Sequence, residues 1–446
     1  MNRNKNFKKN NYKKNRMWLF PIIYIAAVVI LTALLALSSF IPHNRLQKQF
    51  KESAKILCSK NVFFDLKEGV ECSKIDRYAD SILLNIAWHF DDSKPLKSIM
   101  WDYYYYTDYQ NENYNLMDAV DGSEKAELQY MRYWHGSAAI VRALHLVFNI
   151  RQIYIVLGIL LLILTICLWL IMLKQGLWQD MIVYIIGLIS VGVWFVPFSL
   201  EYTWTFVCMT VTSIVVLSFL IKDKEGAVGI VFMLAGIITN YLDFLTTETI
   251  TLSIPLLIAY RYKSKCKNTS LNSNVSNNIW LAKNIFCWGA GYVGMWLSKW
   301  FVAGVVLKQN VMQYVLTHIE ERLVGEVDDM PIIKYLWLTL IRNIKCLFPS
   351  GYGNIGVVVS VLIVVAVIYV GYVYHNKRID KGDVLLYALI GLIPIVRFLV
   401  LHNHSYIHYF FTYRALMASV MACSFIFAQI VDWRYIGNAF FGKRIH

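Results

Sequence analysis

Two aspartates, Asp76 and Asp80, have the type and spacing that favour acid–base chemistry. They lie four residues apart in Lys74–Phe90, where apolar residues repeat at the spacing of an amphipathic helix. Two carboxylates on one row of a helix repel each other, which raises the pKa of one toward a value suited to proton abstraction. The alternative interpretation is a solvated helix face with two ordinary surface acids.

A second reactive group falls in Leu401–Leu416, which combines three imidazoles with several aromatic rings and one guanidinium. His404 and His408 have the i, i+4 spacing that can bind a metal, but the turn holds no cysteine or carboxylate to complete a ligand set. A guanidinium pairs bidentately with phosphate oxygens, so Arg414 suits a phosphate at the membrane interface. We predict a substrate site without metal, formed by His404, His408, Tyr413 and Arg414.

The segment Asn240–Thr251 carries a third group, with two acids, Asp243 and Glu248, among four threonines. Such a group can orient an acceptor, hold a divalent ion, or cap a broken helix. The sequence leaves these alternatives open. We count both acids as candidate substrate-binding residues, together with Arg142.

The composition indicates what kind of protein positions these groups. The chain has 446 residues, a mean hydropathy of +0.47 and 57% hydrophobic residues, which is typical of a helical protein that crosses a membrane several times. Much of the net charge of +14 lies in residues 1–16, which contain seven basic residues and no acid. Such a segment is typical of a cytoplasmic tail beside anionic lipid, and it lacks the interleaved aromatic residues expected of a nucleic-acid-binding tail.

The hydropathy pattern predicts an all-α integral membrane protein with about ten spans. The predicted spans are 17–41, 151–173, 181–200, 203–221, 227–242, 245–260, 284–307, 355–374, 384–401 and 414–432. The intervening loops that carry lysine or arginine then lie with both termini on the cytoplasmic side. Residues 17–446 form one membrane domain with two large outer loops, 42–150 and 308–354. We expect amphipathic interfacial helices within 74–90, 133–150 and 311–347.

This topology places most of the candidate residues on the outer side, near span ends, where charges usually have a function. The outer loop 101–114 adds aromatic rings among carboxylates and amides, which suit either sugar rings or the lipid headgroup region. Cys58 and Cys72 lie in the same loop, where an oxidising compartment would allow them to pair, and the sequence leaves their pairing open.

Four blocks of the chain resemble the GT-C superfamily of polytopic membrane glycosyltransferases, and in particular a largely uncharacterised bacterial group. The blocks are YADSILLNIA, RYWHGSAAIVRALHLVF, NYLDFLTT and NHSYIHYFFTYRA. The resemblance also extends to the arrangement of nearly the whole chain, with one span, a long outer loop and about nine further spans. In this chain the aspartates lie farther from the first span than is usual in the family.

The resemblance implies an inverting glycosyltransferase of the bacterial plasma membrane, with its active site on the extracytoplasmic side. The donor would be a polyprenyl-phosphate-linked sugar, the acceptor an envelope glycan or glycolipid, and the catalytic base Asp80, with Asp76 second. A polysaccharide polymerase or ligase acting on polyprenyl-diphosphate-linked glycans is the alternative function. A transporter is a third class, for which charges at mid-depth and two related halves are expected.

Overall fold

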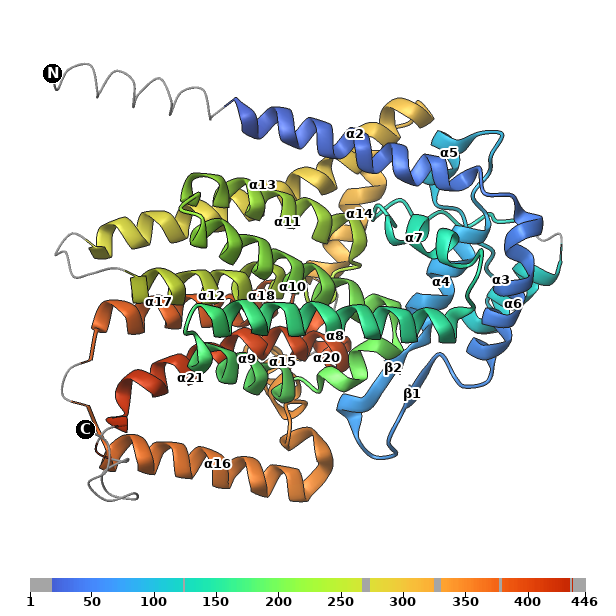
Figure 1. The fold of residues 1–446 in the computed structure, drawn as a ribbon. Helices are drawn as coiled ribbons and strands as arrows, with labels where there is room; N and C mark the ends of the chain where they lie inside the picture. Colours follow the sequence, from blue (N-terminus) through green and yellow to red (C-terminus); the bar gives the residue numbers. More distant parts are fainter. Residues whose placement is uncertain are drawn as a thin grey trace, which may run out of the picture.

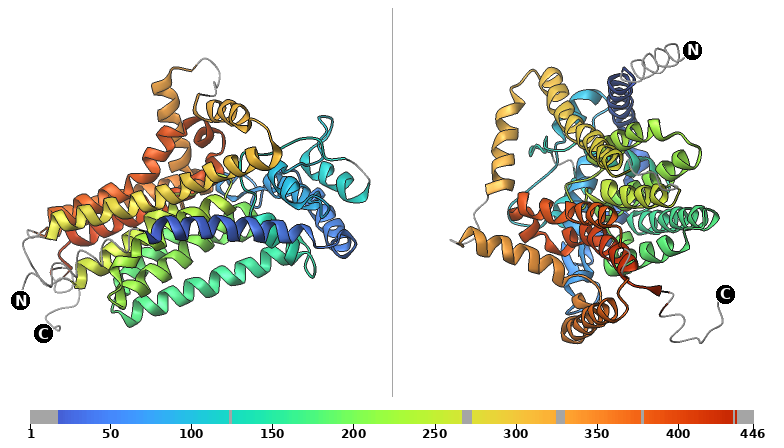
Figure 2. Two further views of the ribbon diagram at one scale, coloured as in Figure 1. Left: turned by 90° about the horizontal axis from the view of Figure 1, so that it is seen from above. Right: turned by 90° about the vertical axis from the view of Figure 1, so that its left-hand side faces the viewer.

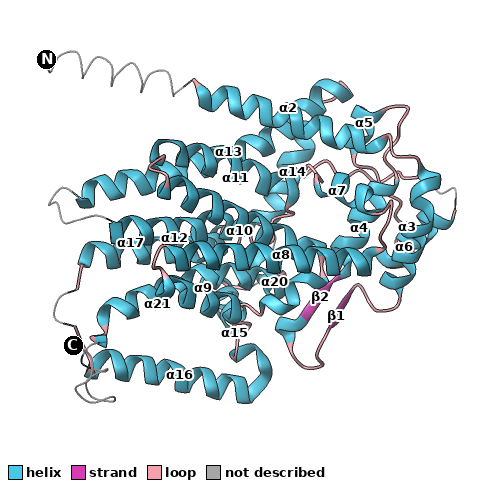
Figure 3. Cartoon of the chain, viewed as in Figure 1, coloured by secondary structure: helices cyan, strands magenta, loops and turns pink. Residues whose placement is uncertain are grey.

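The computed structural model describes residues 18–122, 125–266, 273–324, 330–376, 379–433 and 435. These residues are almost entirely helical, with a single sheet of two short strands, as Figure 3 shows. The predicted basic tail, residues 1–16, lies outside the described residues.

Eight helical segments of the described chain are long and apolar enough to cross a membrane, which confirms a multi-pass α-helical membrane protein. They are α2 (Leu19–Ser39), α8 (Ile150–Lys174), α10 (Leu200–Ile221), η3 with α11 (Glu225–Ala227, Val228–Leu242), α13 (Ser273–Leu307), η4 with α16 (Ser350–Tyr352, Gly353–Val373), α17 with α18 (Lys381–Gly391, Ile393–Val400), and α20, η5 and α21 (Tyr409–Thr412, Tyr413–Leu416, Met417–Ile430).

Two of the ten predicted spans correspond to shorter helices. They are α9 (Trp178–Ser190), followed by η2 (Val193–Phe198), and α12 (Ile250–Cys266), which contains Pro255. The side chains of residues 251–260 are all buried, so α12 lies inside the bundle.

The long helices run roughly parallel, and the first large loop packs against one end of the bundle (Figures 1 and 2). Two spans lie at the edge: in the end-on view of Figure 2, α2 and α16 stand apart from the centre. Along α16 only Gly356 is buried, and its apolar side chains are exposed on every face. Such surfaces are suited to contact with lipid.

The first loop folds as a small helical layer with one hairpin. Its elements are α3 (His43–Cys58), β1 (Phe63–Asp65), η1 (Glu71–Ser73), β2 (Lys74–Asp76), α4 (Arg77–Trp88), α5 (Pro95–Trp101), α6 (Glu112–Asp121) and α7 (Ser137–Leu144). The two strands are antiparallel, with Phe63 opposite Asp76. The apolar face of α4, including Leu83 and Ile86, is completely buried, as its periodicity predicted.

Two predicted helices are shorter than expected. The segment 74–90 begins as strand β2, and α4 starts only at Arg77 because Asp76 is its N-cap and accepts from the Ala79 N–H at 2.9 Å. In 133–150 only α7 is helical before α8, because His135 has a φ of +49°, which interrupts a right-handed helix.

The second large loop contains two helices, α14 (Val311–Val324) and α15 (Ile332–Lys345), as predicted for 311–347. The sequence also suggests that these two helices join near residues 328–331, of which 328 and 329 lie outside the described residues. A short helix, α19 (His402–Ile407), then connects α18 to α20. Because α15 packs against α18, α19 and α20, the second loop supports the turn that carries the predicted histidines.

Cys58 and Cys72, whose pairing the sequence left open, do not form a disulfide. Both thiols are free, and each faces a different backbone carbonyl: that of Asn113 at 3.2 Å for Cys58, and that of Gly351 at 3.6 Å for Cys72.

Candidate functional site

Asp80 is a completely buried carboxylate at the N-terminus of α10. It accepts hydrogen bonds from the Tyr154 hydroxyl at 2.5 Å, the Ser199 hydroxyl at 3.2 Å and the Leu200 N–H at 3.1 Å. Burial raises the pKa of Asp80 to about 6, although these donors oppose the shift. Since helix N-termini carry partial positive charge, Asp80 fits a structural role that joins the first loop to α10.

Asp76 has a different set of partners. Its carboxylate accepts from the backbone N–H groups of Ala79 and Tyr78, and its side-chain neighbour is the carboxyl group of Glu201, to which it is hydrogen-bonded. Burial, followed by the charge of Asp80, raises the pKa of Asp76 to about 7. Within the described part of the chain, Oε2 of Glu201 has no hydrogen-bond partner. Asp76 and Glu201 thus form a buried acid pair that can share one proton.

Arg414, on η5, presents a guanidinium with two unused nitrogens. Its side chain is only 1% exposed and stacks on the rings of Tyr202 at 4.3 Å and Tyr413 at 4.9 Å. Nη1 donates to the Phe410 carbonyl, whereas Nε and Nη2 have no acceptor among the described residues. A buried cation is costly without an acceptor, so this arrangement favours an anionic ligand.

Tyr202 connects Arg414 to the acid pair. It directly follows Glu201, its ring lies against the Arg414 guanidinium, and its hydroxyl donates to the Lys74 carbonyl at 3.2 Å, two residues before Asp76. The phenol is within electrostatic range of both Asp76 and Arg414. A proton acceptor and a phosphate-type anion site therefore meet around one residue.

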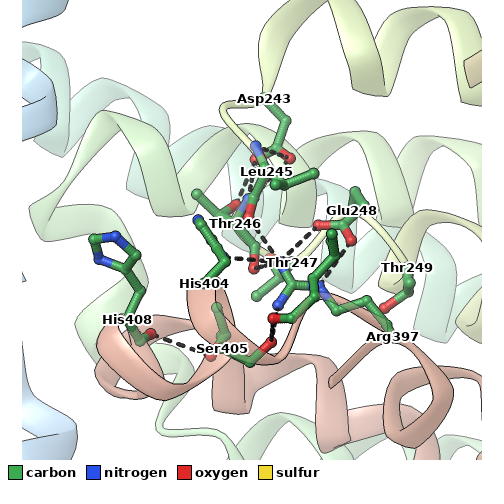
Figure 4. Close-up of polar contacts among 12 residues, drawn as sticks. Asp243, Leu245, Thr246, Thr247, Glu248, Thr249, Arg397, His404, Ser405 and His408 are labelled. Carbon is green, nitrogen blue, oxygen red and sulfur yellow. Dashed lines mark hydrogen bonds and ion pairs between the residues drawn. The ribbon is translucent and has the colours of Figure 1, made fainter. Parts of the chain in front are cut away.

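Arg397 organises the region beside this site, as Figure 4 shows. Its guanidinium donates to Glu248 Oε1 at 2.9 Å, to the Ser405 hydroxyl at 2.8 Å and to the Leu245 carbonyl at 2.8 Å. The ion pair with Glu248 is buried on both sides. Glu248 therefore has a buried ion-pair partner, and Arg397 joins loop 243–249 to α19.

Asp243 stabilises the turn of the same loop. Its carboxylate accepts from the Leu245 and Thr246 N–H groups, at 3.0 and 3.1 Å, and from the Thr246 hydroxyl. Leu245 adopts a φ of +71°, which this turn holds in place. Burial and the nearby charge of Glu248 raise the pKa of Asp243 to about 7. Asp243 is also within electrostatic range of Glu201, so it borders the acid pair.

His404 and His408 lie side by side, with ring centroids 4.7 Å apart. Nδ1 of His404 is 3.4 Å from a nitrogen of Arg397, and His408 stacks on Phe411 at 5.1 Å. Phe411 in turn contacts Tyr202 at 5.8 Å. The structure thus brings the histidine pair, Tyr413 and Arg414 to the same region as Asp76.

Arg142 is not part of this group. It donates to the Ser38 carbonyl at 2.9 Å, the Ile41 carbonyl at 2.8 Å and the Ala87 carbonyl. These carbonyls lie at the C-terminal ends of α2 and α4, where a cation is favourable. Arg142 therefore fits a structural role rather than the predicted contact with substrate.

A metal centre does not fit the described residues, because no three of their histidine, cysteine, aspartate and glutamate side chains are grouped so as to hold an ion. Asp243 and Glu248, which suited a divalent ion by their spacing, are engaged by Thr246 and Arg397 instead.

Sequence reasoning missed a buried charge cluster at the junction of the first loop with α13. Lys299 Nζ lies 2.7 Å from Asp102 Oδ2, and His135 Nδ1 lies 3.0 Å from the same oxygen. All three side chains are buried. Lys299 was detectable in the sequence as a lone charge within an apolar span. Its partners, Asp102 and His135, both have a φ of +49°, and no sequence pattern marked them.

The chain matches no known family, no curated protein and no solved structure. An assignment of function must therefore come from the site itself.

Proposed function

We propose that this protein is an inverting glycosyltransferase of the bacterial plasma membrane. It transfers a sugar from a polyprenyl-phosphate carrier to an envelope glycan or glycolipid on the outer face. The observation that carries the proposal is the buried Arg414 guanidinium, two of whose nitrogens have no acceptor in the described part of the chain, beside the Asp76–Glu201 acid pair.

Arg414 binds the phosphate of the donor. Its Nε and Nη2 are two adjacent donors, the arrangement that pairs with two phosphate oxygens. The guanidinium lies over the rings of Tyr202 and Tyr413, and these contacts fix the orientation of its plane. His404 and His408 lie on the adjacent turn, where they contact the sugar or its phosphate.

Asp76 is the base. Its carboxylate takes the proton of the acceptor hydroxyl while the hydroxyl oxygen forms a bond to the anomeric carbon. The bond between that carbon and the phosphate oxygen breaks, and the phosphate leaves with the electron pair toward Arg414. Single displacement inverts the anomeric centre. We assign Asp80 the structural role of anchoring α10, because its oxygens already accept from four side-chain or backbone groups.

In the membrane we propose ten spans with both termini cytoplasmic. Eight segments have the length and apolarity of spans, and the shorter α9 and α12 complete the ten. The first loop, with Asp76, then faces the outer side. This side carries lipid-linked sugars after their export, so donor and acceptor meet the site there.

Arg414→Lys tests the phosphate assignment. Lysine keeps the charge but loses the paired donors, so we expect the affinity for a polyprenyl-phosphate sugar to fall about tenfold or more. Arg342→Lys is the matched control, since Arg342 also stacks on two tyrosines, Tyr406 and Tyr409, at 4.3 Å. Unchanged donor affinity in purified, folded Arg414→Lys protein would remove Arg414 from the site.

Analysis of a deletion strain distinguishes the proposed class from its alternatives. We expect mass spectrometry to show loss of one sugar substituent from an envelope glycan and accumulation of its lipid-linked donor. Accumulation of whole repeat units on the carrier would instead identify a polymerase or ligase. Retention of the lipid-linked sugar on the cytoplasmic face of the membrane would identify a transporter.

A further inference from the structure

A second group of aromatic and cationic side chains lies on the first loop, separate from Arg414. The guanidinium of Arg132 lies over the Tyr130 ring at 4.6 Å, and the imidazole of His135 lies 4.9 Å from the same ring. Tyr104 contacts Tyr130 at 6.1 Å, and Tyr106 contacts Tyr104 at 6.3 Å. Since Tyr106 is 44% exposed, this series of rings leads from the surface to the buried histidine.

Both nitrogen-bearing side chains have an unused hydrogen-bonding atom. Among the described residues, Nε of Arg132 and Nε2 of His135 have no partner, although His135 is only 1% exposed. The strongest electrostatic neighbours of Arg132 are tyrosines, and Glu112 and Asp102 lie within range of neighbouring tyrosine rings. Among the described residues no carboxylate forms an ion pair with Arg132, so this partly buried guanidinium is suited to an anion supplied from outside.

His135 adds a requirement for a hydroxyl group. Its Nδ1 is held by Asp102 at 3.0 Å, so Nε2 is the atom that remains for a ligand. Burial lowers the pKa of His135, and a neutral imidazole bonded to a carboxylate through Nδ1–H offers Nε2 as an acceptor. The ligand must therefore donate a hydroxyl as well as present a negative charge.

We infer that Tyr104, Tyr130, Arg132 and His135 form a subsite for an acidic sugar unit of the acceptor glycan, in which a carboxylate or phosphate pairs with Arg132. A hydroxyl of that unit donates to His135, and the tyrosine rings cover the apolar face of the sugar ring. The identity of the ligand as an acceptor rests on the proposed function, whereas the binding itself does not.

The position of the group fits an acceptor. Tyr78, two residues after Asp76, is within electrostatic range of Glu112, Tyr104, Tyr130, Arg132 and Asp76. The subsite thus adjoins the N-terminal end of α4, where the proposed base lies. A sugar unit bound at Arg132 leaves the next unit of its chain near the acid pair.

Binding of defined oligosaccharides to the full-length protein in nanodiscs tests the inference. The probes are a glucuronate-containing oligosaccharide, a neutral oligosaccharide of equal length, and nanodiscs with or without anionic phospholipid. We expect the acidic oligosaccharide to bind in neutral nanodiscs, and Arg132→Gln to weaken it about tenfold or more. The neutral oligosaccharide should bind weakly to the wild type and equally to the variant. Arg342→Gln is the control and should bind as the wild type does.

His135→Gln provides a second measurement, since glutamine keeps a polar atom but cannot reproduce the imidazole held by Asp102. It should weaken both oligosaccharides by a similar factor, because the hydroxyl is common to both. Equal binding of the acidic probe by wild type and Arg132→Gln overturns the inference. So does competition by anionic phospholipid that depends on Arg132, which would identify a lipid headgroup site. Binding of the acidic probe without any sugar transfer would refute the proposed function and leave the subsite standing.

Discussion

Asp76 and Asp80 are the same residue type on neighbouring turns, yet their surroundings make them different groups. Asp80 accepts hydrogen bonds from Tyr154, Ser199 and the start of α10, and these bonds stabilise its charged form. Asp76 is hydrogen-bonded to another acid, Glu201, and therefore readily exchanges a proton. A base must both gain and lose a proton in each cycle, so the poorly solvated pair is suited to catalysis.

Replacing each aspartate by asparagine should separate the two roles. We expect Asp76→Asn to lower the transfer rate about 10²–10⁴-fold with little loss of thermal stability. Asp80→Asn should instead destabilise the protein by about 1–3 kcal/mol, because a buried charge-assisted cap is lost, and should retain much of its activity once folded. The measurements are sugar transfer and thermal unfolding of membrane-inserted variants. A fully active Asp76→Asn, or an inactive but stable Asp80→Asn, would reverse the assignment.

The raised pKa of Asp76 makes the rate of sugar transfer and the thermal stability depend on pH. Transfer should increase as pH rises through about 7, where Asp76 becomes an acceptor for protons. Stability should change in the opposite direction: the raised pKa favours the protonated folded state, so this contribution is complete below about 3.8 and is lost as pH rises through about 7.

Asp80→Asn gives the control for the pH profile. The charge of Asp80 is one cause of the raised pKa of Asp76, so its removal should move the midpoint of the rate profile to lower pH. Rate profiles of the two proteins between pH 5 and about 9 check this. An identical midpoint in wild type and variant would show that another group controls the rate.

The sequence located the acids and the arginine but could not reveal their partners. Four-residue spacing is a local signal, so Asp76 and Asp80 were readable as neighbours. The donors that distinguish them come from Tyr154 and Ser199, which lie 74 and 119 residues further along the chain. In the same way, Arg142 was correctly seen as a charge near a span end, but its carbonyl partners on α2 and α4 depend on packing.

Among the helices and the short hairpin, too, some elements were predictable from the sequence and others were not. Apolar periodicity predicted α4 and α15, each of which buries one face, and it also predicted α14. Strand β2 has only three residues and pairs with a strand of equal length, too short for an alternating pattern to be recognised. The interruption at His135 was also hidden, since its positive φ depends on Asp102 and the surrounding rings.

The ion pair between Arg397 and Glu248 fastens α18 to loop 243–249, so its removal tests how these elements depend on each other. We expect Arg397→Met or Glu248→Leu alone to cost about 3–5 kcal/mol, because each leaves a buried charge without its partner. The double variant should be more stable than the sum of the two predicts, as measured by thermal unfolding in one detergent. Strictly additive losses would mean that the two side chains act independently.

The arrangement across the membrane can be tested with accessible cysteines in a protein whose eight native cysteines are replaced. Tyr109→Cys lies on the first loop at a position that is 76% exposed, and Lys224→Cys lies on the exposed turn between α10 and α11. An impermeant thiol reagent should label Tyr109→Cys in intact cells and Lys224→Cys only after lysis. The opposite pattern would invert the topology and place the acid pair in the cytoplasm.

The contact between Asp80 and α10 joins two segments that the ribosome makes at different times. Residue 80 leaves the ribosome 120 residues before Leu200, which corresponds to about 6–24 s at the usual 5–20 residues per second. During this delay the first loop already has Arg142 to join α2 to α4, but it lacks the helix end that its aspartate caps. The first loop therefore assembles in two steps, and a pause in translation near residue 200 prolongs the stage in which Asp80 lacks its helix end.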